Sequence, residues 1–271
     1  MSVNGTDHLG VNLTFAKFIF ITPRDDDDAA RLRLRNAGAL VARGFFNDFD
    51  VQNGHDAGPH ETIQFLAASG LRGAEGSGPA VSSGIAAARY AIQISSKYRP
   101  RLQDAEVELR RRLGDHAQIV ALEGATRVPQ YTSAEMYAFA YKQALTRMTG
   151  RLARNAIIIP IRKSPEWWAM NSLERHVYFY PHTDRETQTA AKGHALAAEA
   201  GISRIFRRLY YHPDGHGHDG QFDFITYFEC ADEHLATFDA IRGNLRDEQQ
   251  NPEWRYVEEG PEWRGHRVLR W

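Results

Sequence analysis

Residues 203–229 read SRIFRRLYYHPDGHGHDGQFDFITYFE and predict a β-hairpin. The two arms, 203–211 and 222–229, are rich in β-branched and aromatic residues, which favour extended backbone. Between the arms, glycine, proline and aspartate recur, as is typical of a chain reversal. A pair of antiparallel strands is therefore expected in the C-terminal half of the chain.

The segments on either side of this hairpin extend it to a β-α-β-β-α-β order. A very apolar strand is expected at 156–161, followed by a helical region at 166–200 that is interrupted near Pro181. After the hairpin, a helix is expected at 231–245 and a last strand at 254–258. This order is that of a ferredoxin-like unit.

The N-terminal half predicts the same order without recognisable sequence identity to the second half. Its expected strands are 11–21, 62–68, 89–95 and 118–122, and its expected helices are about 25–46 and 101–113. The Gly/Ser/Pro-rich stretch 74–84 is expected to be an inserted loop, and 132–154 a helical connector. We therefore predict an α+β fold with a structural N-terminal half (1–131), the connector (132–154) and a functional C-terminal half (155–271). Two such units commonly join their sheets into one antiparallel barrel with the helices outside.

The charge balance and the cysteine count exclude several classes of protein. The chain has 33 Lys and Arg against 34 Asp and Glu, which disfavours nucleic acid or an anionic membrane as the main partner. No apolar run approaches the roughly 20 residues that span a bilayer. With Cys230 as the single cysteine, a disulfide within the chain is impossible. The N-terminal residues do not resemble a signal peptide, so we expect a cytoplasmic protein.

Two residues of the C-terminal half are candidates for a functional site. Arg207 alternates with Ile205 and Leu209 on one face of the first hairpin arm, which we expect to point inward. A buried guanidinium needs an anion nearby, either a structural carboxylate or a ligand. His194 shares a helical stripe with alanines 190, 191 and 198, which would leave room for a flat molecule, although a histidine at such a position is more often structural. Residues 216 and 218 form an H-x-H pattern, which suggests metal affinity. The alternative interpretation is an ordinary glycine-rich hairpin loop.

The sequence resembles the chlorite dismutase family, a haem-dependent group within the dimeric α+β barrel superfamily. The resemblance is carried by IPIRKSPEWW at 159–168, by RRLY at 207–210 and by FDFITYFE at 222–229. The separation between His194 and Arg207, 207 − 194 = 13 residues, equals the family's spacing from its proximal histidine to its distal arginine. The likeness covers residues 156–271, whereas the first half shares only the order of its elements and GLRG at 70–73.

This resemblance implies a role for each matching residue. His194 would be the axial ligand of haem b, with His182 as the alternative because 178–192 is longer than the corresponding family segment. Glu253 would accept a hydrogen bond from the other ring nitrogen of that histidine. Arg207 would stand over the open face of the iron. The remaining cofactor contacts would come from Trp167 and Trp168, and, at the propionates, from Lys163 and Tyr131.

The implied activity is conversion of chlorite to chloride and dioxygen through a ferryl intermediate and bound hypochlorite. Alternatives are another, peroxidase-like haem oxidation, coproheme decarboxylation, and a haem-binding or haem-transfer protein without turnover. The substrate would be a small anion or oxidant, and the family favours homo-oligomers, with a pentamer preferred for this lineage. Neither nucleic acid nor a membrane is expected as a partner.

Overall fold

The computed structural model describes residues 14–47, 61–69, 80–126, 133–138, 143, 153–217 and 221–271. Several expectations fall outside these ranges, namely Tyr131, His218, the GLRG motif at 70–73 and most of the connector. The described part of the connector contains a short helix, α4 (Ala134–Tyr137). The limits of the three predicted segments therefore stay a prediction.

The first half alternates strands and helices in the expected order. Its elements are β1 (Phe15–Pro23), α1 (Asp28–Val41), β2 (Phe46–Asn47), β3 (Thr62–Ala68), α2 (Ala80–Ala86), β4 (Tyr90–Ser96), α3 (Arg99–Leu113) and β5 (Ala117–Ala125). Helix α1 begins where the side chain of Asp27 accepts a hydrogen bond from the backbone N–H of Ala30 at 2.6 Å. The four main strands pair antiparallel in the order β5-β1-β4-β3.

The second half follows the same plan with additional short elements. They are β6 (Asn155–Lys163), α5 (Pro165–Ala169), α6 (Ser172–Val177), β7 (His182–Thr183), β8 (Ala190–Ala191), α7 (Gly193–Ala197), β9 (Ile205–Tyr211), β10 (Phe224–Cys230), α8 (Leu235–Arg246), β11 (Val257–Glu259) and β12 (Trp263–Val268). Its main strands run in the order β9-β10-β6-β12, with β11 pairing beside β12 on the same edge of β6. When the four main strands of each half are numbered along the chain, both halves have the strand order 4-1-3-2, which is the ferredoxin-like arrangement.

The two halves share one large sheet, which confirms the α+β class. Strand β12 pairs with β3, and β9 meets β5. A continuous barrel stays a prediction, because among the described residues β5 and β9 are joined by one pair, Ala125 with Tyr211. No helix in the described ranges is both long enough and apolar enough to cross a membrane.

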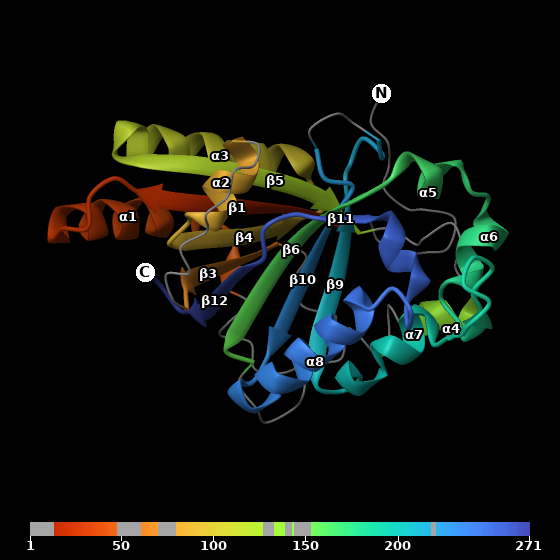
Figure 1. Ribbon diagram of the computed structural model, residues 1–271. Helices are drawn as coiled ribbons and strands as arrows, with labels where there is room; N and C mark the ends of the chain where they lie inside the picture. The colour runs from red at the N-terminus through yellow and green to blue at the C-terminus, as the bar shows by residue number, and fades with distance from the viewer. Residues whose placement is uncertain are drawn as a thin grey trace.

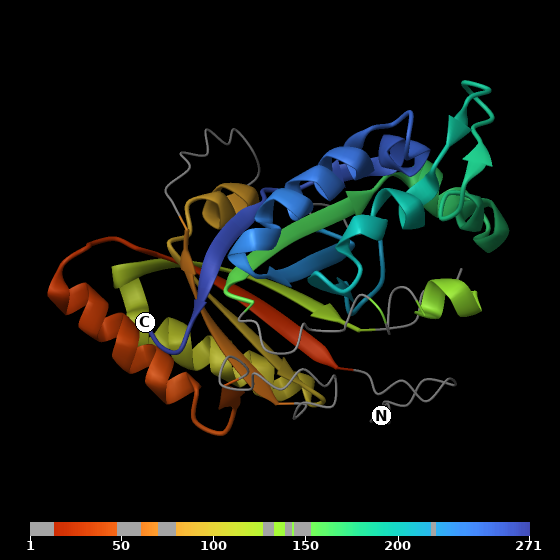
Figure 2. The ribbon, with the colours of Figure 1, turned by 90° about the horizontal axis from the view of Figure 1, so that it is seen from below.

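Helices cover the sheet on its outer faces (Figures 1 and 2). Figure 2 shows α1 and α3 on one side of the molecule and α8 on the opposite side, with the strands between them. Apolar residues of β1, β3 and β4 pack against α1 and α3, and those of β6 and β9 pack against α8. A third core lies between the two halves and includes Phe18, Tyr210, Tyr227 and Trp263. The second half therefore has one face of its sheet on this shared core and one face toward α8.

The structure corrects four details of the predicted elements. Residues 80–84, expected in a loop, belong to helix α2. The helical region predicted for 166–200 is broken, since residues 178–192 contain the small hairpin β7–β8. Of residues 254–258, expected in the last strand, 254–256 lie in a 3₁₀ turn and only 257 and 258 lie in a strand, β11. The last strand is β12, which the sequence pattern did not predict, because its buried positions are Trp263, Gly265 and Arg267 rather than apolar residues at every second position.

Candidate functional site

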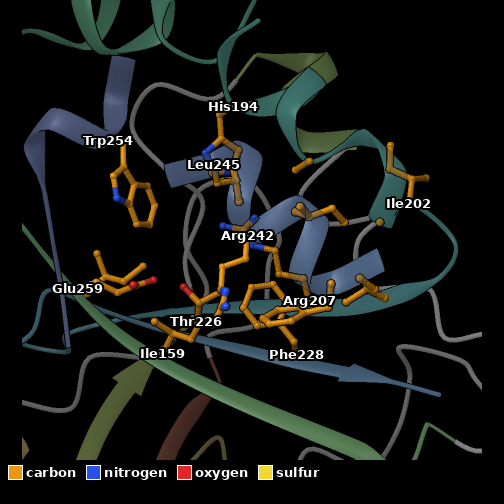
Figure 3. A pocket seen from close by; sticks show the side chains of 16 residues that line it. Ile159, His194, Ile202, Arg207, Thr226, Phe228, Arg242, Leu245, Trp254 and Glu259 are labelled. Atoms are coloured by element: carbon orange, nitrogen blue, oxygen red, sulfur yellow. The ribbon is translucent and has the colours of Figure 1, made fainter. Parts of the chain in front are cut away.

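A pocket opens between the C-terminal sheet and the helices that cover it (Figure 3). Strands β6, β9 and β10 form its floor, while α7 and α8 form its walls. Most lining side chains are apolar, among them Ile159, Ile205 and Phe228. His194 and Arg207 both line it, from a helix and a strand respectively. The structure thus brings together the two residues that the sequence analysis singled out, in the kind of apolar cavity that binds small molecules.

Arg207 reaches this pocket because side chains alternate along β9. Its neighbour Phe206 points into the core between the two halves, whereas Ile205 packs with the α8 face. The Arg207 face therefore points into the protein, toward α8, while the Phe206 face points into the core between the halves. Arg207 is half-buried, and its side chain has no hydrogen bond or ion pair with any other described residue. Its guanidinium is available to an anion in the pocket.

The backbone before His194 places the imidazole. Gly193 has a φ of 71°, and a Cβ on it would lie 2.3 Å from the carbonyl oxygen of Tyr180. The N–H of Gly193 donates to the carbonyl of Gln250 at 3.2 Å, and the N–H of His194 donates to that of Tyr178 at 3.0 Å. The predicted alanine stripe does not exist, because residues 190 and 191 lie in β8 rather than in the helix. A glycine turn tied at both ends therefore holds His194 at the start of a short helix.

A half-buried carboxylate connects His194 to Lys163. Nδ1 of His194 lies 3.2 Å from Oε2 of Glu253, and Nζ of Lys163 lies 2.7 Å from Oε1 of Glu253. Burial favours the protonated acid, but the ammonium of Lys163 and the imidazole of His194 together hold the pKa of Glu253 below its usual range. Glu253 is therefore an anion that orients the imidazole and leaves Nε2 for the pocket.

Lys163 and Trp167 lie behind the pocket rather than in it. The ammonium of Lys163 is 4.0 Å from the centre of a Trp167 ring, and both side chains are buried. The sequence interpretation placed Lys163 on a propionate, whereas the structure places its ammonium on Glu253. Trp167 packs in turn against Tyr178 and Tyr256 at centroid distances of 5.7 and 5.8 Å. These residues support the imidazole from behind.

Trp168 lies on the opposite side of its helix and braces the loop after β9. Its Nε1 donates to Oδ2 of Asp223 at 3.2 Å, and its ring stacks on His216 at 3.6 Å. Oδ2 of Asp223 also accepts a hydrogen bond from the backbone N–H of Lys163 at 2.8 Å. Trp168 does not line the pocket, so its position indicates support for the end of β6.

His182, the alternative to His194, lies elsewhere. It belongs to β7, its Nδ1 is 2.8 Å from the carbonyl oxygen of Tyr180, and its ring packs on Tyr178. It is not among the residues that line the pocket. The geometry therefore favours His194 over His182.

The sequence analysis overlooked three further pocket residues. Trp254, Arg242 and Thr226 line the cavity, and all three are visible in Figure 3. Trp254 directly follows Glu253, which the sequence resemblance had already assigned to the site, so Trp254 could have been predicted. Arg242 had no such signal, because only the packing of α8 on the sheet shows that this arginine lies on the buried side of the helix.

Solved structures share this architecture. Chlorite dismutase from Candidatus Nitrospira defluvii in complex with imidazole matches with a TM-score of 0.62 at 22% identity, over 94% of this chain and 91% of that chain. A variant of that protein with one arginine replaced by alanine matches with a TM-score of 0.63 at 21% identity over the same shares. No protein-family model matches the chain. The resemblance seen in the sequence is confirmed for the architecture, and this chain has the chlorite dismutase fold.

Proposed function

We propose that this protein binds haem b in the pocket between α7 and β9 and converts chlorite to chloride and dioxygen. The observation that supports it most strongly is the placement of His194 and Arg207 in one apolar pocket on different elements. The fold resemblance to chlorite dismutase structures supports the same proposal.

The residues of the pocket fit an iron porphyrin. The apolar floor and the α8 wall suit the flat, mostly apolar faces of a macrocycle. His194 offers one imidazole nitrogen, while its other nitrogen is held by Glu253, as is usual for a histidine that binds a metal. Bound haem would supply the redox chemistry that the side chains lack.

The chain's own residues would prepare the anion for reaction. Arg207 stays charged at every relevant pH and presents several N–H donors, so it can bind a chlorine oxyanion and keep it in the pocket. The surrounding isoleucine and phenylalanine side chains exclude water and strengthen that attraction. Glu253, paired with Lys163, would accept the hydrogen bond from Nδ1 of His194, which fixes the ring for ligation.

Haem binding and oxygen release test the proposal with matched variants. His194→Ala should abolish the Soret spectrum of a ligated haem, whereas His182→Ala should retain it. In reconstituted wild type, chlorite should release dioxygen rapidly. Arg207→Ala should lower that rate by about 10²-fold or more, as for the loss of an electrostatic donor. Arg208→Ala, on the other face of the same strand, should be nearly neutral. A wild type that binds haem through His194 but releases no oxygen would refute the chlorite activity.

A peroxidase-like oxidation is the second candidate. It is favoured by the aromatic cluster of Trp167, Tyr178 and Tyr256 directly behind Lys163, where Tyr178 and Tyr256 have their hydroxyl oxygens 3.2 Å apart. Such rings can donate single electrons. Oxidation of a phenolic dye by hydrogen peroxide, compared between wild type and Tyr178→Phe, measures this activity. Equal rates in both proteins would exclude a role for the cluster.

The homo-oligomer, with a pentamer preferred, is also part of the proposal. Light scattering on the haem-loaded protein measures its mass directly. A monomer would refute it.

A further inference from the structure

The apolar face of helix α8 carries a charged residue. Phe238, Ile241 and Leu245 line the pocket at helical spacing, and Arg242 lines it with them. In Figure 3 the side chain of Arg242 lies between His194 and Leu245 on one side and Arg207 and Thr226 on the other. A guanidinium on the buried face of a helix is costly unless it meets an anion.

The ion pairs of Arg242 within the protein do not use all of its N–H donors. Nη1 of Arg242 donates to Oε2 of Glu262 at 2.6 Å, and Nη2 lies 3.8 Å from Asp239. Glu262 also pairs with Arg264 and lies 3.7 Å from Arg246. Since a guanidinium has five N–H groups, Arg242 keeps donors for a molecule in the pocket.

The charges that line the pocket favour an anionic occupant. Arg207 has no partner among the described residues, and Arg242 shares Glu262 with two other arginines. The one carboxylate among the lining residues is Glu259, which forms an ion pair with Arg246. The pocket therefore presents two guanidinium groups, from facing elements, to whatever it binds.

We propose that Arg242 is a second anion-binding residue of this pocket and takes a carboxylate or an oxyanion of the occupant. The inference rests on the proposed function for the identity of the pocket. Two sources of the same chemistry are possible, a propionate of the porphyrin or a free small anion. A charge-assisted hydrogen bond of this kind corresponds to at least about a tenfold change in affinity.

Metal-free protoporphyrin IX and its dimethyl ester separate the first source from all others, because the ester keeps the ring and removes both negative charges. Binding is followed by quenching of tryptophan fluorescence, which requires no iron ligation. Arg242→Gln should weaken protoporphyrin binding by about tenfold and leave the ester unchanged. Arg242→Lys should restore part of the affinity. Arg264→Gln is the matched control, because Arg264 pairs with the same Glu262 and Asp239 but does not line the pocket.

Nitrite, a small oxyanion, tests the second source when its binding to the haem-loaded protein is measured. If porphyrin affinity is unchanged but Arg242→Gln weakens nitrite binding about tenfold, the inference holds with a free anion as the ligand. The inference is overturned if neither affinity changes, if protoporphyrin and its ester weaken equally, if Arg264→Gln has the same effect, or if the wild type binds no porphyrin. A thermal melt of each variant checks the fold. Failure of the proposed function gives another result, namely Arg242-dependent porphyrin binding without a haem spectrum that depends on His194.

Discussion

Nδ1 of His194 lies 3.2 Å from Oε2 of Glu253, and this contact joins α7 to the 3₁₀ turn after α8. The carboxylate fixes which nitrogen of the imidazole faces the pocket. Because Glu253, with a side chain 14% exposed, also pairs with the buried Lys163, the orientation of His194 depends on this ion pair.

Glu253→Gln should destabilise the protein by about 3–5 kcal/mol, because it leaves the buried ammonium of Lys163 without a carboxylate. Urea denaturation followed by circular dichroism measures the free energy of unfolding. The double variant Glu253→Gln with Lys163→Met is the control and should recover much of the loss, since no buried charge remains unpaired. A single variant as stable as the wild type would show that the pair is hydrated.

The contribution of Glu253 should also depend on pH. Its folded pKa lies below the ordinary value of 4.5, so the ionised form stabilises the folded state above that value. The stability difference between wild type and Glu253→Gln should be constant from about pH 7 to about pH 5 and shrink as pH falls below about 4.5. Urea titrations at several pH values measure this difference. A stability difference that grows as the pH falls would contradict a lowered pKa of Glu253 in the folded protein.

Gly193→Ala should weaken both folding and the placement of His194. At a φ of 71°, an added Cβ would lie 2.3 Å from the carbonyl oxygen of Tyr180, so the turn must shift. We expect a loss of about 2 kcal/mol or more in the free energy of unfolding, together with faster haem loss. Gly243→Ala is the control, because its Cβ would meet no atom within 4 Å on helix α8. It should stabilise the protein by about 0.5–1 kcal/mol. Equal effects at both positions would refute the argument.

Cys230 should be inert in the folded protein. It is 1% exposed at the end of β10, and burial raises the pKa of its thiol to about 11. A disulfide reagent such as Ellman's reagent should therefore react at pH 8 only after unfolding in urea. Rapid labelling of the native protein would mean that this end of β10 opens.

Much of the fold follows from local pattern. Runs rich in β-branched and aromatic residues predict β9 and β10 within a few residues, because such side chains favour extended backbone, and the predicted bounds of β3 and β4 agree as closely. The final strand was not predicted, since two of the three buried positions of β12 are Gly265 and Arg267. The small hairpin within the helical region predicted for 166–200 was also not predicted, because β7 and β8 have two residues each and depend on their mutual pairing.

The sequence alone determined the order of most main strands and helices and the hairpin of β9 and β10, since these depend on residues close together along the chain. Only the tertiary structure decided which side chains surround His194 and Arg207. It placed the Arg207 face under α8 rather than in the core between the halves, and it moved Lys163 onto Glu253. It also turned Arg242 into the pocket. These contacts join residues far apart in sequence, so the packing of whole elements determines them and no local pattern records it.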